Sequence, residues 1–427
     1  MKLQKKHKIS NGVYIHRELE NLIKPFIKRK EVLAIIGPRQ VGKTTFLQYL
    51  NSQLERGGEL VKFITFEKRS DLELFDNIED FKDFHKKYQT IIIDEFQYAK
   101  QGGQKLKYLF DTTKTKYIIS GSSSLDIKFQ TGRYMVGRML KFMLWPFSFR
   151  EYLLGKNKAL YELLISRVSD VFSSSIKKAP GPEINSRLEK LFEDYLIFGG
   201  YPAVVLSKSQ LEKEKILESI LDNYLLRDIK GLLQLATENE LIRLIKFLAA
   251  QAGNLINYQE LSNSCGLNYK ELLRHLEILR QTYIIDLIKP YFTNKRTEIT
   301  KNPKVYFVDT GFKNLALSDF RNLNQRKDMG SLVENYVFMA LKRKTNGFQN
   351  INFWRTKSKA EVDFIIQKEN KVIPIEVKYS SKPVIGKSLY SFIEKFSPSQ
   401  CFVFTKNYAK EMKIKNCKIK FIPVYYL

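Results

Sequence analysis

The stretch EVLAIIGPRQVGKTTFLQYL, residues 31–50, decides how the N-terminal third of the chain folds. The apolar run before Gly37 predicts a buried strand, and the residues that follow the loop favour a helix. Between them, GPRQVGKT at positions 37–44 satisfies the pattern GxxxxGK[ST] in full. Glycines let backbone N–H groups wrap around phosphates, and the N-terminus of the next helix adds positive potential. The stretch therefore predicts a phosphate-binding loop between strand and helix rather than a chance glycine-rich turn.

This loop predicts contacts with ATP and with Mg²⁺. Lys43 should reach the β and γ phosphates, and the Thr44 hydroxyl should ligate Mg²⁺. Arg39 could also face the nucleotide, although side chains inside such loops often point outward. The expected nucleotide-binding residues are Gly37, Pro38, Arg39, Gln40, Val41, Gly42, Lys43, Thr44 and Thr45, together with Asp94.

Two acids end a second apolar run, YQTIIIDEFQYAK at residues 88–100. We expect Asp94 to hold the magnesium through a water, because the acid after this strand does so in P-loop NTPases. Glu95 is suited to polarise the attacking water, since the end of a strand is rigid enough to keep a general base within reach. The adjacent pair indicates hydrolysis rather than nucleotide binding alone.

A third strand is predicted by KYIISGSSS at residues 116–124, and it ends in small polar residues. Ser120 or Ser122 could orient the water near the γ-phosphate. A plain serine-rich turn is an equally good reading of the same residues.

The order of these motifs resembles an AAA-type P-loop ATPase family of bacteria and archaea. GPRQVGKTT, IIIDEFQYA, ISGSSS and GRMLKFMLWPFSFREYL occur in the family's order, as do FGGYP at 198–202 and YLLRDI at 224–229. Members join such a domain to a C-terminal domain of uncharacterised function, and the resemblance covers nearly the whole chain. It implies an ATP-hydrolysing core that an arginine completes. By motif position Arg138 is the first candidate and Arg133 the second, while a surface arginine is an equal alternative for each.

Composition limits the class of protein. The chain has 427 residues, too many for one core, and its 44% hydrophobic content excludes wholesale disorder. A formal net charge of +27 favours a polyanion as partner, and we expect DNA rather than a membrane surface because no bulky amphipathic anchor is present. The three cysteines form no CxxC pair, and neither a signal peptide nor a membrane span is evident. We therefore expect a soluble, cytoplasmic protein, with assembly into a homo-oligomer left open.

The middle of the chain predicts a winged helix. Residues 254–292 read as a short helix, a glycine turn and a second amphipathic helix, followed by two strands around a basic loop. We expect Leu273 on the inner face of the second helix and His275 toward solvent. A winged helix can place its second helix in the DNA major groove, but use only for protein contacts is an equal alternative.

The C-terminal third places acids on a predicted helix and on strands. Glu334 lies within an amphipathic helix, Asp363 in EVDF, and Glu376 and Lys378 share one strand face in IEVK. If the two strands form a hairpin in the simplest register, Asp363 and Glu376 converge. Carboxylates held close repel one another unless a cation such as Mg²⁺ neutralises them, and a lysine beside a metal-bound water can assist attack on a phosphodiester.

These four residues resemble the PD-(D/E)xK nuclease superfamily, and the same pattern is found in the C-terminal domain of the ATPase family. The resemblance implies Glu334, Asp363 and Glu376 as metal ligands and Lys378 as a catalytic residue. Asp363 is not preceded by the proline of the motif, which is a common departure. A degenerate fold kept for packing or DNA docking is the alternative.

Taken together, the sequence predicts an α/β protein in which an AAA-type P-loop domain precedes a winged helix and a restriction-endonuclease-like domain. We expect an ATPase switch or motor coupled to DNA processing by a metal-dependent nuclease. The alternative is a signalling or scaffold ATPase whose nuclease-like domain only binds partners or DNA. The expected domains are the P-loop domain at 1–155, a helical lid and connector at 156–250, the winged helix at 251–312 and the nuclease-like domain at 313–427.

Overall fold

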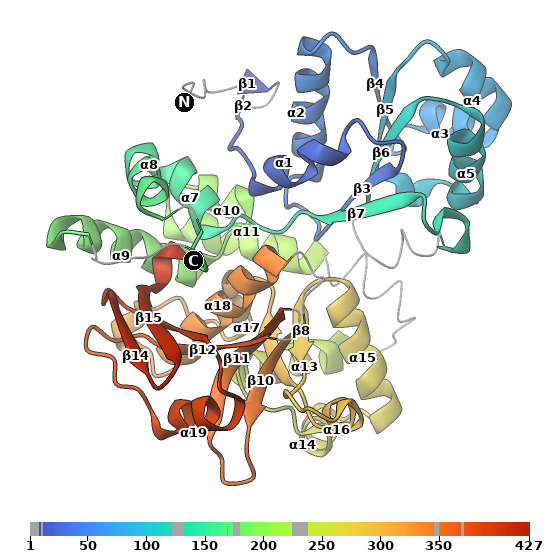
Figure 1. The fold of residues 1–427 in the computed structure, drawn as a ribbon. Helices are drawn as coiled ribbons and strands as arrows, with labels where there is room; N and C mark the ends of the chain where they lie inside the picture. Colours follow the sequence, from blue (N-terminus) through green and yellow to red (C-terminus); the bar gives the residue numbers. More distant parts are fainter. Residues whose placement is uncertain are drawn as a thin grey trace. The chain divides into compact units, whose positions relative to one another are not determined.

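The chain divides into two compact units in a computed structural model. The first comprises residues 1–147 with 281–283, and the second comprises residues 148–280 with 284–427. In Figure 1 most of the first unit is blue to cyan and most of the second is green to red. The structure describes residues 8–9, 12–121, 132–168, 170–173, 180–223, 238–345, 350–368 and 371–427.

The first unit is built on a five-stranded sheet with the order β4-β5-β6-β3-β7, in which every neighbouring pair is parallel. Its strands are β3 (Val32–Ile36), β4 (Val61–Thr65), β5 (Thr90–Asp94), β6 (Lys116–Gly121) and β7 (Met139–Met143). A parallel sheet is covered on both faces, so its central strands are continuous apolar runs, as the sequence around residues 31–36 and 90–94 predicted.

Helices flank this sheet on its two faces, with α2 on one side and α3, α4 and α5 on the other (Figure 1). The elements outside the sheet are β1 (Lys8–Ile9), β2 (Gly12–Val13), α1 (Glu18–Ile23), η1 (Lys24–Phe26), α2 (Lys43–Arg56), α3 (Arg69–Asp76), α4 (Ile78–His85), η2 (Phe96–Tyr98), α5 (Gly102–Thr112) and η3 (Gly132–Met135).

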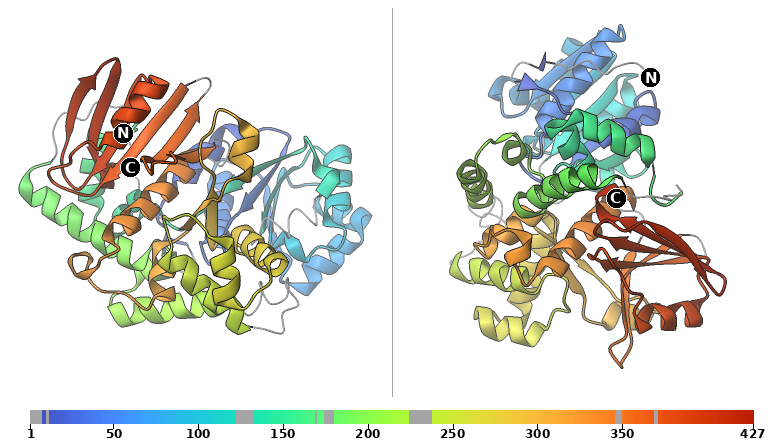
Figure 2. Two further views of the ribbon diagram at one scale, coloured as in Figure 1. Left: turned by 90° about the horizontal axis from the view of Figure 1, so that it is seen from below. Right: turned by 90° about the vertical axis from the view of Figure 1, so that its left-hand side faces the viewer.

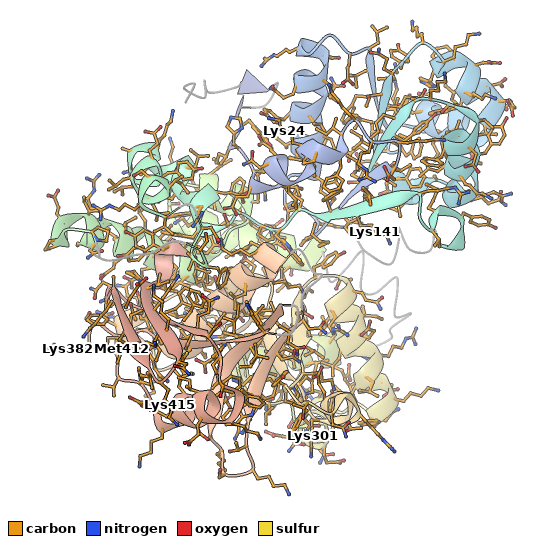
Figure 3. All side chains as sticks on the ribbon, viewed as in Figure 1. Lys24, Lys141, Lys301, Lys382, Met412 and Lys415 are labelled. Atoms are coloured by element: carbon orange, nitrogen blue, oxygen red, sulfur yellow. The ribbon has the colours of Figure 1, made fainter. Side chains whose placement is uncertain are left out.

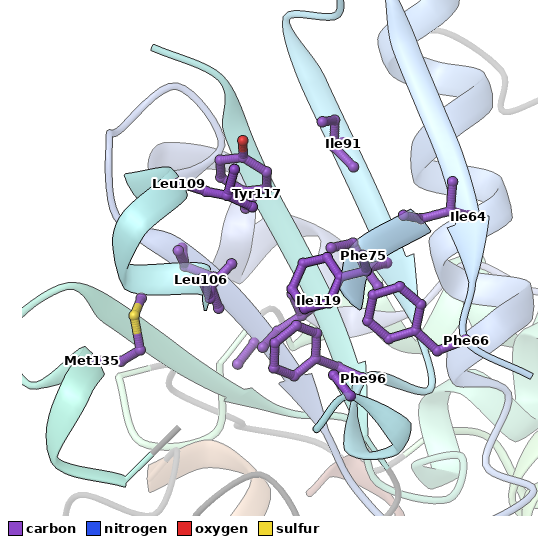
Figure 4. Close-up of a cluster of buried hydrophobic side chains, with 14 of the residues drawn as sticks. Ile64, Phe66, Phe75, Ile91, Phe96, Leu106, Leu109, Tyr117, Ile119 and Met135 are labelled. Carbon is purple, nitrogen blue, oxygen red and sulfur yellow. The ribbon is translucent and has the colours of Figure 1, made fainter. Parts of the chain in front are cut away.

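Aromatic side chains fill the space between the sheet and helices α3 to α5 (Figure 4). Phe75 lies at the centre, with ring centroids 4.9 Å from Phe66, 5.1 Å from Phe81 and 6.0 Å from Phe96. Tilted and edge-on rings at these separations add to the free energy gained from burying their area. This cluster fixes the strand ends from which the acidic residues project.

The second unit begins with helices and continues into a short antiparallel pair of strands. Its helices up to that pair are α7 (Phe149–Lys156), α8 (Lys158–Arg167), α9 (Pro182–Phe198), α10 (Pro202–Leu206), α11 (Gln210–Asn223), α13 (Glu238–Ala250), α14 (Tyr258–Cys265) and α15 (Tyr269–Gln281). The pair consists of β8 (Ile285–Ile288) and β9 (Lys304–Phe307), with α16 (Lys295–Thr300) between them.

A six-stranded mixed sheet, ordered β10-β11-β12-β13-β15-β14, forms the C-terminal part. Helix α19 covers one face through Leu389, Phe392 and Ile393, and Figure 2 shows it lying along the strands. The remaining elements are α17 (Thr310–Ala316), η5 (Leu323–Gln325), α18 (Met329–Thr345), β10 (Ile351–Arg355), β11 (Glu361–Lys368), β12 (Lys371–Lys378), α19 (Lys387–Phe396), β13 (Gln400–Thr405), β14 (Lys410–Ile414), β15 (Cys417–Pro423) and η6 (Val424–Tyr426).

Some local predictions are confirmed and others are wrong. Strands β11 and β12 lie where the strands that carry Asp363 and Glu376 were expected, and β8 and β9 bracket the basic loop. Helix α9 begins at Pro182, because proline suits the first turn of a helix. The predicted orientation of α15 is partly wrong, because His275 is 2% exposed and Leu273 is 40% exposed.

Candidate functional site

Two glycines shape the loop between β3 and α2. Gly37 has φ +154°, and a Cβ at this position would lie 2.1 Å from the carbonyl oxygen of Leu144. Gly42 has φ +89° and is the residue before α2. Only glycine adopts these conformations at low cost, so the loop is fixed by its own sequence.

Lys43 is held inside this loop. Its Nζ donates to the carbonyl oxygens of Gly37 at 3.1 Å and Pro38 at 2.8 Å, and the residue is 5% exposed. The loop carbonyls therefore hold the positive charge of Lys43 in place beside the loop. Thr44 and Thr45, the next residues on α2, are exposed.

A hydroxyl and a carboxylate meet where the loop faces the end of β5. Thr44 Oγ1 donates to Asp94 Oδ2 at 2.6 Å, although the two residues are 50 apart in the sequence. Both groups are oxygen ligands of the kind that Mg²⁺ prefers, and each is where the sequence predicted a magnesium ligand. The residues present therefore fit a magnesium ion at this point.

Ser120 orders the two acids after β5. Its hydroxyl donates to Asp94 Oδ1 and accepts the backbone N–H of Glu95 at 3.1 Å, and Ser120 is fully buried. Ser122, the alternative candidate, lies outside the described residues. Glu95 adopts φ +53°, a left-handed conformation that is uncommon for a residue with a side chain, and its Oε2 accepts a hydrogen bond from Gln97.

Arg17 is a site residue that the sequence analysis missed. Its guanidinium donates to the carbonyl oxygens of Val41 at 3.0 Å and Trp145 at 2.5 Å, and it lies 4.7 Å from the centroid of the Phe147 ring. The residue is 5% exposed and precedes α1, whose Glu20 accepts the Arg17 N–H at 2.7 Å. Only Glu20, which accepts the Arg17 N–H, fits part of a capping pattern, since arginine has no side-chain acceptor, and nothing in the sequence indicates the contact with the loop.

Arg138 does not lie near the phosphate loop. In the parallel pair β3–β7, Val32 is opposite Met139 and Ile36 is opposite Met143, so Arg138 precedes the start of β7. The loop follows the other end of β3, about 15 Å away at the usual rise per residue. Arg138 instead pairs with Asp111 at 3.2 Å, and both side chains are partly exposed. The side chain of Arg133 lies outside the described part of the chain.

A second group of charged side chains lies in the C-terminal sheet of the other unit. Phe364 pairs with Ile375 in the antiparallel β11–β12 hairpin, which is the register that the sequence suggested. Asp363 Oδ2 accepts the N–H of Val377 at 2.7 Å. Glu376 Oε1 lies 2.9 Å from Lys378 Nζ.

Burial and like charge perturb these carboxyls. Burial raises the pKa of Asp363 well above its usual range, and the neighbouring charges of Glu376 and Glu334 raise it further. Burial also raises the pKa of Glu376, against the opposing effect of Lys378. For Lys378, burial acts to lower the pKa, but the charge of Glu376 leaves it raised overall.

Glu334, the third predicted ligand, is held by other groups. Its Oε1 lies 3.2 Å from Lys304 Nζ and accepts the hydroxyl of Tyr306 at 2.6 Å. Within the described ranges, no group of three or more Asp, Glu, His or Cys side chains has the arrangement of a metal site. The structure does bring Asp363 and Glu376 together, and Glu376 Oε2 is buried without a hydrogen-bond partner. The structure thus leaves one unsatisfied carboxylate oxygen beside Asp363, and among the described residues it does not arrange the three predicted acids as a metal site.

Comparison with known families divides the chain into three segments. Residues 29–153 match the family described as "AAA domain". Residues 189–324 match "Domain of unknown function (DUF8612)", and residues 329–427 match "Domain of unknown function (DUF4143)".

The relatives that match most of this chain are described as uncharacterized proteins. An uncharacterized protein of Haemophilus influenzae is 25% identical over 382 residues, which is 84% of this chain and 86% of the relative. One from Methanocaldococcus jannaschii is 25% identical over 374 residues, covering 84% of this chain and 78% of that protein. AMPPCP-bound DnaA from Aquifex aeolicus has a TM-score of 0.30 and 13% identity, covering 62% of this chain and 89% of that one.

The first unit thus contains a P-loop domain of the AAA type, and such a loop implies nucleotide binding, typically with Mg²⁺. It is followed by two further domains whose function is unknown in the families they match. No helix in the described ranges is both long and apolar enough to cross a membrane.

Proposed function

We propose that the first unit binds ATP and hydrolyses it. The observation that carries the proposal is the 2.6 Å contact between the Thr44 hydroxyl and the Asp94 carboxylate, with Lys43 held in the loop and Glu95 next in sequence. This set combines phosphate binding, magnesium ligands and a base on two adjoining elements.

Each residue has a distinct role in this proposal. Lys43 and the N–H groups of the loop hold the phosphates, and Thr44 and Asp94 would hold Mg²⁺, which supplies charge neutralisation between phosphates when bound. Glu95 accepts a proton from the attacking water. Ser120 keeps the Asp94 carboxylate and the Glu95 backbone in place.

Two variants test this assignment. Lys43→Ala should abolish ATP hydrolysis, because the loop loses its charge toward the phosphates. Glu95→Gln should still bind ATP but turn over at least about a hundredfold more slowly, the usual contribution of a positioned general base. Lys100→Ala, an exposed lysine of the same unit, is the matched control. Wild-type turnover by the Glu95→Gln protein would remove Glu95 from the mechanism.

The place of Arg138 favours assembly of several copies. If Arg138 is the arginine that completes the ATPase site, it must serve the site of a neighbouring copy, since about 15 Å of strand separates it from its own loop. We therefore include a homo-oligomer in the proposed function.

A second candidate function is cation-dependent cleavage of nucleic acid by the C-terminal sheet. The observation that favours it is the buried, unpartnered Oε2 of Glu376 beside Asp363 and Lys378. An unsatisfied carboxylate oxygen is costly unless a ligand completes it. Two carboxylates would hold Mg²⁺ or Mn²⁺, and Lys378 would stabilise negative charge on the phosphodiester.

DNA as partner is supported by charge and by local architecture. The net charge is +27, and α14, α15, β8 and β9 follow one another as helix, helix and antiparallel strands, the order of a winged helix. On α15, Tyr269, Lys270 and Arg274 are exposed, but so are Glu271 and Glu277. Because these acids would repel DNA, we do not expect α15 to read bases. We expect other surfaces to contact the DNA backbone, such as those that bear Lys301, Lys382 and Lys415 in Figure 3.

Cleavage assays separate this function from the alternative of a scaffold ATPase. Duplex and single-stranded DNA are incubated with Mg²⁺ or Mn²⁺, with ATP, without it, and with a non-hydrolysable analogue. Asp363→Asn and Glu376→Gln should each abolish cleavage and leave ATP hydrolysis unchanged. If the wild-type protein cleaves nothing under all these conditions, the C-terminal domain is a binding module.

A further inference from the structure

Lys304 lies at the edge of the carboxylate group just described, although it belongs to the middle segment of the chain. It is the first residue of β9, whereas Glu334, Asp363 and Glu376 come from α18, β11 and β12. Its Nζ is 3.2 Å from Glu334 Oε1 and 2.6 Å from Glu361 Oε1, and its side chain is 2% exposed. One matched family segment ends at residue 324 and the next begins at residue 329. The contact between Lys304 and Glu334 therefore joins these two segments.

Further contacts fix Lys304 and Glu334 in place. Tyr306, on the same strand, donates to the oxygen of Glu334 that faces Lys304, and its ring stacks on Phe338 with centroids 4.6 Å apart. Arg355 binds the second oxygen of Glu361 at 2.9 Å. Lys304 is thus a buried lysine between two acids, and each of these acids has a second partner. Such an arrangement is more constrained than an ion pair on the surface.

We propose that Lys304 is a positioning residue that removes Glu334 from the set of cation ligands and restricts the C-terminal site to Asp363 and Glu376. The inference rests on the proposed cation site. Its physical basis is twofold: the ammonium satisfies the carboxylate that a cation would otherwise attract, and its positive charge opposes a second positive charge nearby. The middle domain thus sets how tightly the C-terminal domain holds a divalent cation.

The test measures Mn²⁺ binding to the full-length, nucleotide-free protein by isothermal titration calorimetry. Asp363→Asn identifies the heat that belongs to the site. Lys304→Met should bind Mn²⁺ at least about tenfold more tightly than wild type, equivalent to about 1.4 kcal/mol. Lys304→Arg, which keeps the charge, and Lys301→Met, which removes an exposed lysine three positions earlier (Figure 3), should bind as wild type does.

A double-mutant cycle assigns the gain to Glu334. Glu334→Gln should leave the affinity of the wild-type protein unchanged, because the ammonium of Lys304 on Oε1 already neutralises the charge of that carboxylate. In the Lys304→Met background the same substitution should cancel the tenfold gain. Tyr306→Phe, which removes a single hydroxyl, should shift the affinity in the same direction as Lys304→Met and provides a test if that variant fails to fold.

The outcomes separate this inference from the proposed function. Site-specific binding that is unchanged or weaker in Lys304→Met and Tyr306→Phe overturns the role of Lys304 and leaves the cation site standing. Binding by Lys304→Met but not by wild type supports the role of Lys304 and removes cation-dependent cleavage. Absence of binding in every variant overturns both.

Discussion

Replacing Arg17 with methionine should destabilise the first unit more than any surface substitution there. The change keeps most of the aliphatic stem and removes the guanidinium that binds Val41 and Trp145 and lies over Phe147. Two carbonyl oxygens then lose a charged donor at a position that is 5% exposed.

The size of the effect follows from these contacts. Hydrogen bonds to a charged group contribute about 1.5–3 kcal/mol each, and a desolvated cation–π contact adds about 1–2 kcal/mol. Methionine regains part of the packing, so we expect a net loss of about 3–5 kcal/mol, or roughly 10 °C in the melting temperature of a unit of this size. Arg29→Met is the matched control, because Arg29 pairs with Glu31 on an exposed surface and its loss should hardly change the stability.

Tryptophan fluorescence reports the transition directly. Trp145 and Trp354 are the two tryptophans of the chain, so a Trp354→Phe background leaves only the one that Arg17 contacts. Urea unfolding of Arg17→Met in this background should shift to lower urea, and ATP affinity should fall because Val41 is part of the phosphate loop. A shift no larger than that of Arg29→Met would refute the view that Arg17 braces the loop.

Three further predictions follow from single features. Arg138→Ala should lower ATP turnover, and mixing it with a Lys43→Ala protein should restore some activity if Arg138 serves a neighbouring copy; no recovery at any ratio argues against that geometry. Burial raises the pKa of Asp309 to about 6 from an ordinary 3.8. As the pH falls, the carboxylate therefore takes up its proton at a higher pH in the folded state than in the unfolded state. Its contribution to stability should therefore rise by about 1 kcal/mol as the pH falls from about 7 to about 5, and the difference in melting temperature between wild type and Asp309→Asn should show this slope. DNA affinity should fall steeply with salt, by a log–log slope of about −0.9 per phosphate contact, and a flat response would favour a protein partner.

The sequence was sufficient for the phosphate loop because its chemistry is local. Gly37 and Gly42 fix the backbone, Lys43 and Thr44 follow at once, and the apolar run before them can only be a buried strand in a sheet covered on both faces. Asp94 could be placed because the acid that ends this strand has a set role in P-loop NTPases, and the ends of the parallel strands lie at one edge of the sheet.

What the sequence could not supply were contacts between distant residues. Arg17 is 24 residues from Val41 and 128 from Trp145, and no pattern links a helix cap to a loop carbonyl across such distances. Arg138 was ranked by motif position, but the register of β7 against β3 places it at the opposite edge from the loop. On α15, the burial of His275 depends on the elements packed against that helix, so helical periodicity alone assigned its direction wrongly.

The C-terminal site shows why four matching residues do not by themselves define a chemistry. Glu334, Asp363, Glu376 and Lys378 lie on the predicted helix and strands, yet Glu334 pairs with a lysine that stands 30 residues before it in the chain. A motif records which side chains are present, whereas a metal site depends on which of their oxygens remain unsatisfied after folding. Here Glu376 keeps such an oxygen and Glu334 shares its Oε1 with Lys304 and Tyr306. We therefore expect any cation binding by this domain to depend on residues of both matched segments, and it has to be measured on the full chain.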